Sequence, residues 1–224
     1  MSNWGLWIIC AGIPLLFGLW AQLRVKSTFR KYSEVRPRNG MSGAEAAAAV
    51  LRSSGLEGLS INPIAGQLTD HYDPRNRTLN LSADVGQASS IAAMGVAAHE
   101  AGHAVQDARN YWPMRVRQTL VPAAQIGSSL WFFPVLLGFI FASTGLITIG
   151  LILLAAIVLF QLVTLPVEFD ASHRALVALQ SQGLLAEDEV PGARKVLNAA
   201  ALTYIAGFVA ALGQLIYLFV ASRN

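Results

Sequence analysis

Long uninterrupted runs of hydrophobic residues alternate along the chain with segments that carry most of its polar side chains. A helix that crosses a bilayer needs about 20 predominantly apolar residues, and four runs approach that length. We therefore predict four transmembrane helices, and we expect Pro122 and Pro134 to kink the second one. The four runs are Trp4–Leu23, Leu120–Ala142, Leu146–Leu165 and Ala201–Val220.

The polar segment between the first two runs shows patterns of water-exposed secondary structure. Ser42 and Glu45 have the spacing of a capping box at the start of a helix, and strong helix formers follow them. Three short segments separated by turn residues then predict a small β-meander or hairpin. A second helical region begins after Ser82. The three short segments are Leu59–Ile64, Gln67–Tyr72 and Thr78–Leu81.

The overall balance of residue types indicates a membrane protein. Hydrophobic residues make up 54% of the 224 residues and charged residues only 13%, whereas soluble domains usually contain about 25% charged residues. The net charge of +3 and the pI near 9.3 do not indicate a nucleic-acid partner. The basic residues cluster beside the predicted spans, where they meet anionic lipid headgroups. The expected partner of these residues is therefore the lipid bilayer.

The positions of Lys and Arg predict which side of the membrane each segment faces. All 16 of them except Arg223 lie in the segments 24–118 and 166–200, and cytoplasmic segments of membrane proteins carry the excess of positive charge. The first hydrophobic run is an anchor rather than a cleaved signal, because no Lys or Arg precedes it and a basic cluster follows it. We therefore expect both segments in the cytoplasm of a cell (plasma or inner) membrane and both termini outside.

These patterns divide the chain into five successive parts. Residues 1–23 form the first transmembrane anchor, and residues 201–224 form the fourth transmembrane helix and an external C-terminus. Between them we expect a cytoplasmic region at 24–118, a transmembrane hairpin at 119–165 and a cytoplasmic helical segment at 166–200. The predicted fold is a mainly α-helical multi-pass membrane protein with a small β element.

The candidate chemistry lies in a His-Glu-x-x-His motif inside a run of helix-forming residues. His99 and His103 are four residues apart, so both imidazoles project from one helix face and can bind one Zn²⁺. Glu100 is offset by about 100° around the axis, which favours contact with a water rather than with the metal. Three protein ligands with an open fourth position lower the pKa of a bound water to about 7. The motif predicts a catalytic zinc site with Glu100 as general base.

Two histidines leave a third metal ligand to identify. Glu168 lies two residues after Pro166, at the predicted cytoplasmic end of the third span. Because the second and third spans form a hairpin, their cytoplasmic ends return to the same surface. We therefore expect His99, His103 and Glu168 to hold the metal.

Three other side chains compete with Glu168 for this role. Asp170 and His173 project from other faces of a helix than Glu168 does. His71 lies in the predicted β element, where it would be a surface histidine, a metal ligand or a hydrogen-bond donor to the transition state. These alternatives stay open on the sequence alone.

Two charged residues near the motif could each have one of two roles beside the proposed metal site. Asp107 follows His103 by four residues, so it could accept a hydrogen bond from the ring of a ligating histidine or remain an exposed helix-end carboxylate. Arg174 could stabilise an oxyanion, but an ion pair with Asp170 or Asp107 is its more ordinary role.

Four segments together give the chain a resemblance to a known family: His99–His103, Val167–Ala175, Asp70–Pro74 and Gly192–Ala200. With them the chain resembles the bacterial neutral zinc metallopeptidases of the YugP type over nearly its whole length, and more distantly the HtpX and CAAX-prenyl endopeptidase group. That resemblance implies a zincin-like region in which Glu168 matches the third ligand, in a Glu-x-x-x-Asp segment. Ser172 stands where that group has Asp.

The function expected from these observations is zinc-dependent hydrolysis of peptide bonds near the cytoplasmic membrane surface. The substrate would be a peptide or a membrane protein. The rival hypothesis is a non-catalytic membrane scaffold or chaperone-like protein that binds zinc for structure only. A closed site with four protein ligands would favour the scaffold, whereas three ligands and an open position would favour the endopeptidase.

Overall fold

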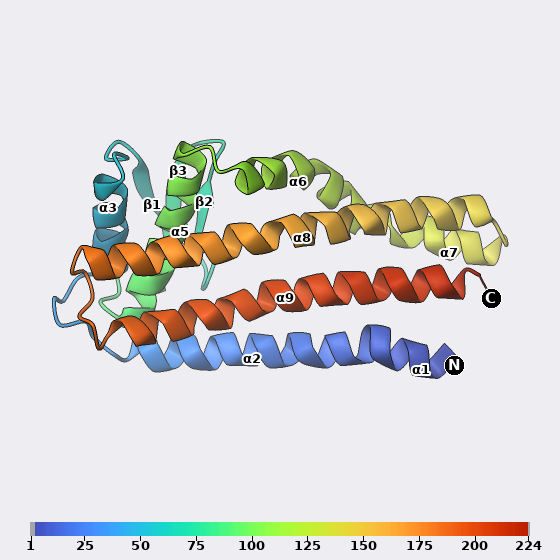
Figure 1. Ribbon diagram of the computed structural model, residues 1–224, viewed down its shortest axis with the longest axis horizontal. Coiled ribbons are helices and arrows are strands. Elements are labelled where there is room, and N and C mark those ends of the chain that lie inside the picture. Colours follow the sequence, from blue (N-terminus) through green and yellow to red (C-terminus); the bar gives the residue numbers. More distant parts are fainter. Residues whose placement is uncertain (1–2, 224) are drawn as a thin grey trace. The chain divides into compact units, whose positions relative to one another are not determined.

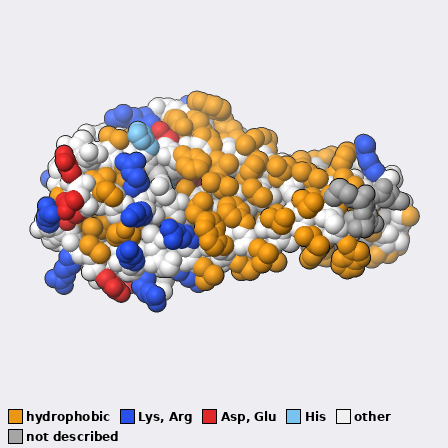
Figure 2. Space-filling model, turned by 60° about the horizontal axis from the view of Figure 1, so that its bottom comes forward, with side chains coloured by type: hydrophobic (Ala, Val, Ile, Leu, Met, Phe, Trp, Pro, Cys, Tyr) orange, Lys and Arg blue, Asp and Glu red, His pale blue; other side chains and the backbone are white. Residues whose placement is uncertain are grey.

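The computed structural model of the protein describes residues 3–223, which are mainly helical and include one small three-stranded sheet. The predicted fold class is confirmed. The chain forms two compact units. Unit 1 comprises residues 1–22, 112–166 and 202–224, and unit 2 comprises residues 23–111 and 167–201. Charged side chains gather over unit 2, whereas the surface of unit 1 is largely hydrophobic (Figure 2).

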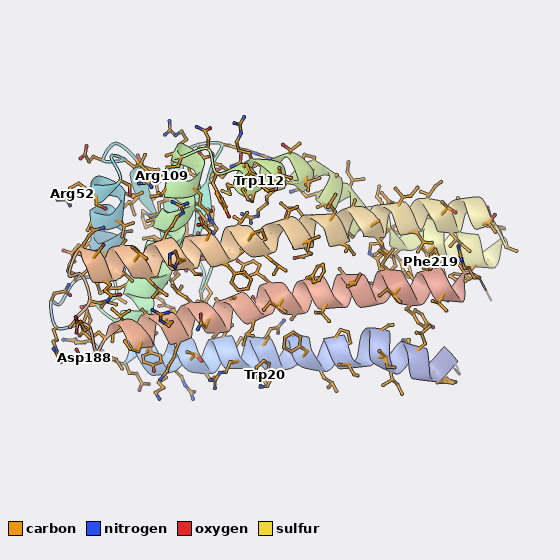
Figure 3. All side chains as sticks on the ribbon, in the orientation of Figure 1. Trp20, Arg52, Arg109, Trp112, Asp188 and Phe219 are labelled. Atoms are coloured by element: carbon orange, nitrogen blue, oxygen red, sulfur yellow. The ribbon has the colours of Figure 1, made fainter. Side chains whose placement is uncertain are left out.

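Four helical stretches are long and apolar enough to cross a membrane, as predicted. Each begins before its predicted span, and the first, third and fourth also continue past the end of that span (Figure 1). Trp20, Trp112 and Phe219 of unit 1 are exposed, as expected of side chains that face lipid (Figure 3). The stretches are α1 (Asn3–Trp7) with the π-helical turn η1 (Ile8–Gly12) and α2 (Ile13–Ser33); α6 (Trp112–Leu130) with α7 (Phe132–Ile140); α8 (Thr144–Ser181); and α9 (Val190–Ala221).

The second of these stretches is interrupted, as its prolines predict. The helix ends at Leu130 and resumes at Phe132. Pro134 lacks an N–H, and its ring clashes with the carbonyl four residues earlier, which is that of Leu130. Pro122 lies inside α6 without ending it. The interruption therefore lies at Trp131 and is attributable to Pro134.

Small residues let the helices of unit 1 approach one another closely. A Cβ added at Gly127 of α6 would lie 2.8 Å from the carbonyl oxygen of Leu153 in α8. Gly213 of α9 makes a still closer approach to the carbonyl oxygen of Cys10. Such contacts between backbones are typical of membrane helices, where van der Waals packing is a principal source of association.

Unit 2 contains the predicted capped helix. Helix α3 (Gly43–Ser53) begins after Ser42, whose hydroxyl accepts a hydrogen bond from the Glu45 N–H at 3.3 Å. The Glu45 carboxylate in turn accepts from the Ser42 N–H at 2.8 Å. The capping box predicted from the spacing is confirmed.

The sheet of unit 2 has the order β1-β3-β2 and consists of β1 (Ser60–Ile64), β2 (His71–Asp73) and β3 (Thr78–Ser82). Strands β2 and β3 form an antiparallel hairpin, but β1 pairs with β3 in parallel. Of the two predicted arrangements, the β-meander is therefore wrong, and the hairpin is confirmed for β2 and β3. The loop before β2 carries the chain past β3, and Asp70 fixes it by accepting hydrogen bonds from the Ser82 N–H and hydroxyl at 2.7 and 3.0 Å.

Helix α5 (Ile91–Ala108) is buried along most of its length. It follows the short helix α4 (Ala83–Gly86), and the Ser90 hydroxyl caps it by accepting from the Ala93 N–H at 3.1 Å. Small residues keep the helix narrow enough to pack against neighbours. A Cβ at Gly102 would lie 2.7 Å from the carbonyl oxygen of Ala171, so α5 and α8 touch backbone to backbone at this point.

Candidate metal centre

Helices α5 and α8 bring the three predicted metal ligands together inside unit 2. His99 and His103 come from successive turns of α5, and Glu168 comes from α8. Glu168 Oε2 lies 3.2 Å from His99 Nε2 and 3.4 Å from His103 Nε2. All three residues are buried, and their ligand atoms lie within 4.8 Å of one another. Of the residues 3–223, only this group of His, Cys, Asp and Glu has the proximity that a metal ion requires.

The donor set and its spacing fit a zinc ion. With metal–ligand bonds near 2.0–2.1 Å, neighbouring ligands of a tetrahedral zinc lie about 3.3 Å apart. The distances from Glu168 to the two histidines bracket that value. Two imidazole nitrogens and one carboxylate also form a common zinc ligand set. His99, His103 and Glu168 therefore could hold Zn²⁺.

Glu100 lies next to this group but is turned toward the sheet. Its carboxylate accepts a hydrogen bond from the Tyr72 N–H of strand β2 at 3.2 Å. The pKa of Glu100 is raised to about 7, mainly because the side chain is removed from water; the neighbouring His99 opposes this rise, and the negative charges of Glu168 and Asp70 add to it. The offset of one residue from His99 thus separates Glu100 from the three converging ligand atoms, as the motif predicts.

The outward-facing ring nitrogens of both histidines have partners in unit 2. His99 Nδ1 lies 3.0 Å from the hydroxyl of Ser172 on α8. His103 Nδ1 lies 3.0 Å from the side-chain oxygen of Gln106 on its own helix. The two Nε2 atoms are consequently the ones that face Glu168. Such partners fix the orientation of metal-binding histidines.

Asp107 does not take the place beside the histidines that its spacing allowed. Its carboxylate accepts a hydrogen bond from the Tyr72 hydroxyl at 2.9 Å. Burial, followed by this hydrogen bond to Asp107, raises the pKa of Tyr72 to about 12. Asp107 therefore connects the end of α5 to strand β2.

Three other sequence candidates lie outside the group of converging ligand atoms. His71 is exposed, and its Nδ1 donates to the Thr69 carbonyl at 2.8 Å. These features match the first of its three predicted roles, that of a surface histidine. His173 is exposed on α8. Asp170 accepts a hydrogen bond from Arg174 Nε at 2.5 Å, which matches the ordinary ion-pair role considered for that arginine.

Gln106 is a site residue that reasoning from the sequence missed. It lies three residues after His103 and is completely buried. Its i, i+3 spacing from His103 places it on the same side of the helix, whereas the sequence prediction named a carboxylate, Asp107, for that role. The signal in the sequence was a polar amide, three residues after His103, in a run dominated by small and apolar residues.

The chain matches a protein family over residues 7–223, and that family is described as "Putative neutral zinc metallopeptidase". The match covers almost the whole sequence, and the His-His-Glu group lies within it. The chain belongs to this family of zinc metallopeptidases.

A curated relative gives a second comparison. The chain is 42% identical over 211 residues to the "Putative membrane protease YugP" of Bacillus subtilis (strain 168). The alignment covers 94% of this chain and 93% of that relative. No solved structure matches the chain. The resemblance seen in the sequence motifs is confirmed.

Proposed function

We propose that the protein is a membrane-embedded zinc endopeptidase that hydrolyses peptide bonds of peptides or membrane proteins near the cytoplasmic membrane surface. His99, His103 and Glu168 would hold the zinc, and Glu100 would act as general base. The observation that carries the proposal is the set of three protein ligands with an adjacent carboxylate that does not join them. That arrangement is typical of catalytic zinc sites, whereas structural sites have four protein ligands.

When bound, the zinc would supply a Lewis acid that polarises the peptide carbonyl and makes water a nucleophile near neutral pH. Glu100 would accept the proton that the water loses as its oxygen bonds to the carbonyl carbon. Glu100 would then donate this proton to the amide nitrogen as the carbon–nitrogen bond breaks. The Tyr72 N–H holds the carboxylate in place by its hydrogen bond. The products are a carboxylate and an amine, so one water is consumed per bond.

The orientation in the membrane is part of the proposal. The excess of Lys and Arg in segments 24–118 and 166–200 supports a cytoplasmic location for these segments. The whole His-His-Glu group belongs to unit 2, which is built from residues 23–111 and 167–201. Hydrolysis would therefore take place on the cytoplasmic side.

The test uses full-length protein purified in detergent, with His99→Ala, His103→Ala and Glu100→Gln variants. Zinc per chain is measured by atomic emission, and cleavage is measured on unfolded polypeptides by mass spectrometry of the new termini. We expect about one zinc in the wild type, little in the histidine variants, and full zinc with strongly reduced cleavage in Glu100→Gln. A wild type that binds no zinc would contradict the proposal. Equal cleavage by wild type and Glu100→Gln would rule out Glu100 as the base.

A further inference from the structure

Gln106 lies at the centre of a buried chain of hydrogen bonds that begins at His103. Its side-chain oxygen lies 3.0 Å from His103 Nδ1. Its side-chain nitrogen donates to the Val167 carbonyl at 2.8 Å and to Asp170 Oδ2 at 2.8 Å. The residue is completely buried, so water cannot replace any of these partners. Both N–H groups of this amide and one lone pair of its oxygen are therefore directed at specific groups on α5 and α8.

The two acceptors determine which way the amide faces. A carbonyl oxygen and a carboxylate oxygen accept hydrogen bonds but have none to donate, so the group that meets them must be the NH₂ of Gln106. The reverse orientation would place the amide oxygen against two acceptors at 2.8 Å, with no hydrogen to share between them. The oxygen of Gln106 must therefore face His103.

That orientation determines the tautomer of His103. An amide oxygen only accepts hydrogen bonds, so Nδ1 of His103 must carry the hydrogen. In the neutral imidazole, Nε2 then has a free lone pair, which is the form that binds a metal. His103 Nε2 is also the atom that faces Glu168, at 3.4 Å. The amide thus selects the tautomer that the proposed metal site needs.

A further ion pair holds the far end of this chain of hydrogen bonds. Asp170 Oδ2 accepts from Arg174 Nε at 2.5 Å as well as from Gln106. The Arg174 guanidinium lies 5.7 Å from the centre of the Tyr111 ring, a cation–π distance. The carboxylate is therefore held by a side chain of its own helix, one turn later.

From these contacts we infer that Gln106 is a positioning residue for the metal ligand His103, and that Asp170 acts on His103 through Gln106. This inference rests on the proposed metal site. It goes beyond that site because it assigns a function to two side chains that touch neither metal nor substrate. The partners of ligating histidines typically contribute 10–100-fold to metal affinity.

The experiment compares zinc affinity in full-length protein freed of metal with a chelator. Competition with a chromogenic chelator gives the dissociation constant, and the visible absorption of the Co²⁺-loaded protein reports ligand geometry. The variants are Gln106→Leu, Asp170→Ala, Asp170→Asn and the double variant Gln106→Leu/Asp170→Ala. Gln180→Leu is the matched control, because Gln180 is an exposed glutamine on α8.

We expect zinc to bind about 10–100-fold more weakly to Gln106→Leu and somewhat more weakly to Asp170→Ala. Asp170→Asn should remain close to wild type, because its amide oxygen can still accept from Gln106. In the double variant, loss of Asp170 should add nothing to the loss of Gln106, since Asp170 acts only through that residue. Gln180→Leu should bind zinc as the wild type does.

Two results would overturn the inference while leaving the proposed zinc site intact. One is wild-type zinc affinity and an unchanged Co²⁺ spectrum in Gln106→Leu. The other is a double variant whose loss equals the product of the two single losses, which would indicate independent effects on packing. If Gln106→Leu does not fold, the comparison of Asp170→Ala with Asp170→Asn decides, and equal affinity in these two would refute the inference. Absence of zinc from the wild type would refute the proposed site itself.

Discussion

The chemistry available to the His-Glu-x-x-His helix depends on where a few individual side chains lie. Helix geometry already places His99 and His103 on one face and Glu100 on another. The proximity of Glu168 to these histidines cannot be derived from helix geometry alone, because it depends on how two membrane spans return to the same surface. The structure brings Glu168 to within 3.4 Å of both histidines. The spacing places Gln106 beside His103, but the contacts of Gln106 with Asp170 and of His99 with Ser172 could not be deduced, since they depend on how α5 packs against α8.

Glu168 and Glu100 should respond differently to the same chemical change. Glu168→Gln replaces a carboxylate ligand by a neutral amide, which binds zinc poorly, so we expect the zinc content to fall. Glu100→Gln should keep the zinc and lose about 10²–10⁴-fold in cleavage rate, the usual contribution of a general base. Metal analysis and cleavage assays on both variants check this. Full zinc occupancy in Glu168→Gln would remove that residue from the ligand set.

The Tyr72 hydroxyl should make stability depend on pH in the alkaline range. Its pKa in the folded protein is about 12, above the ordinary value of 10. The contribution to stability is therefore fully present below pH 10 and is lost as the pH rises toward 12. The difference in the free energy of unfolding between wild type and Tyr72→Phe should be smaller at pH 12 than at pH 9. Urea unfolding in detergent at both pH values measures this difference, and an equal difference at the two pH values would contradict the prediction.

At the scale of secondary structure, prediction worked where a local signal determines the outcome. The capping box of Ser42 and Glu45 marks the start of α3, and Pro134 accounts for the break at Trp131. The sheet was harder to predict, because three short segments with similar patterns are compatible with several pairings. The parallel pairing of β1 with β3 depends on a loop held by Asp70 and Ser82, a contact that no periodicity reveals.

The contact between α5 and α8 should depend on Gly102. In Gly102→Ala the new methyl group would lie 2.7 Å from the carbonyl oxygen of Ala171, so the helices must separate. Forcing such a contact typically costs about 1–3 kcal/mol, and zinc affinity should fall because the two helices carry the ligands. Thermal unfolding and zinc competition measure these two effects.

Gly95→Ala provides the matched control on the same helix. Its Cβ would lie 3.5 Å from the Cβ of Ala193, an ordinary van der Waals distance. We expect stability to be unchanged or higher by up to about 1 kcal/mol, because alanine favours helix over glycine. Equal destabilisation by both substitutions would show that close backbone contact at Gly102 is not the cause.

For the whole molecule, the four hydrophobic helices could be predicted because membrane-spanning segments have a strong signal in length and composition. The ends of these helices carry a weaker signal, because polar residues can continue a helix beyond its apolar stretch. The helix that contains the third predicted span continues through Pro166 to Ser181. A proline inside a helix is tolerated when neighbouring groups stabilise the freed backbone.

The orientation of the whole molecule in the membrane can be tested by cysteine labelling. We expect Ser181→Cys to be labelled only when the reagent reaches the cytoplasm and Ser222→Cys to be labelled from outside. The native Cys10 is buried, and the unmodified protein gives its background reaction. Intact cells treated with a membrane-impermeant maleimide provide the measurement. External labelling of Ser181→Cys would reverse the proposed topology.

The separation of the ligands along the chain has a consequence for biosynthesis. His99 and Glu168 are 69 residues apart in sequence, and the second and third membrane helices lie between them. A ribosome therefore completes both histidines long before it synthesises the carboxylate that would join them. The full set of three ligands can assemble only after the intervening pair of helices has been made. A nascent protein released before Glu168 would consequently lack a complete zinc site, so the proposed hydrolytic activity would await synthesis of that helical pair.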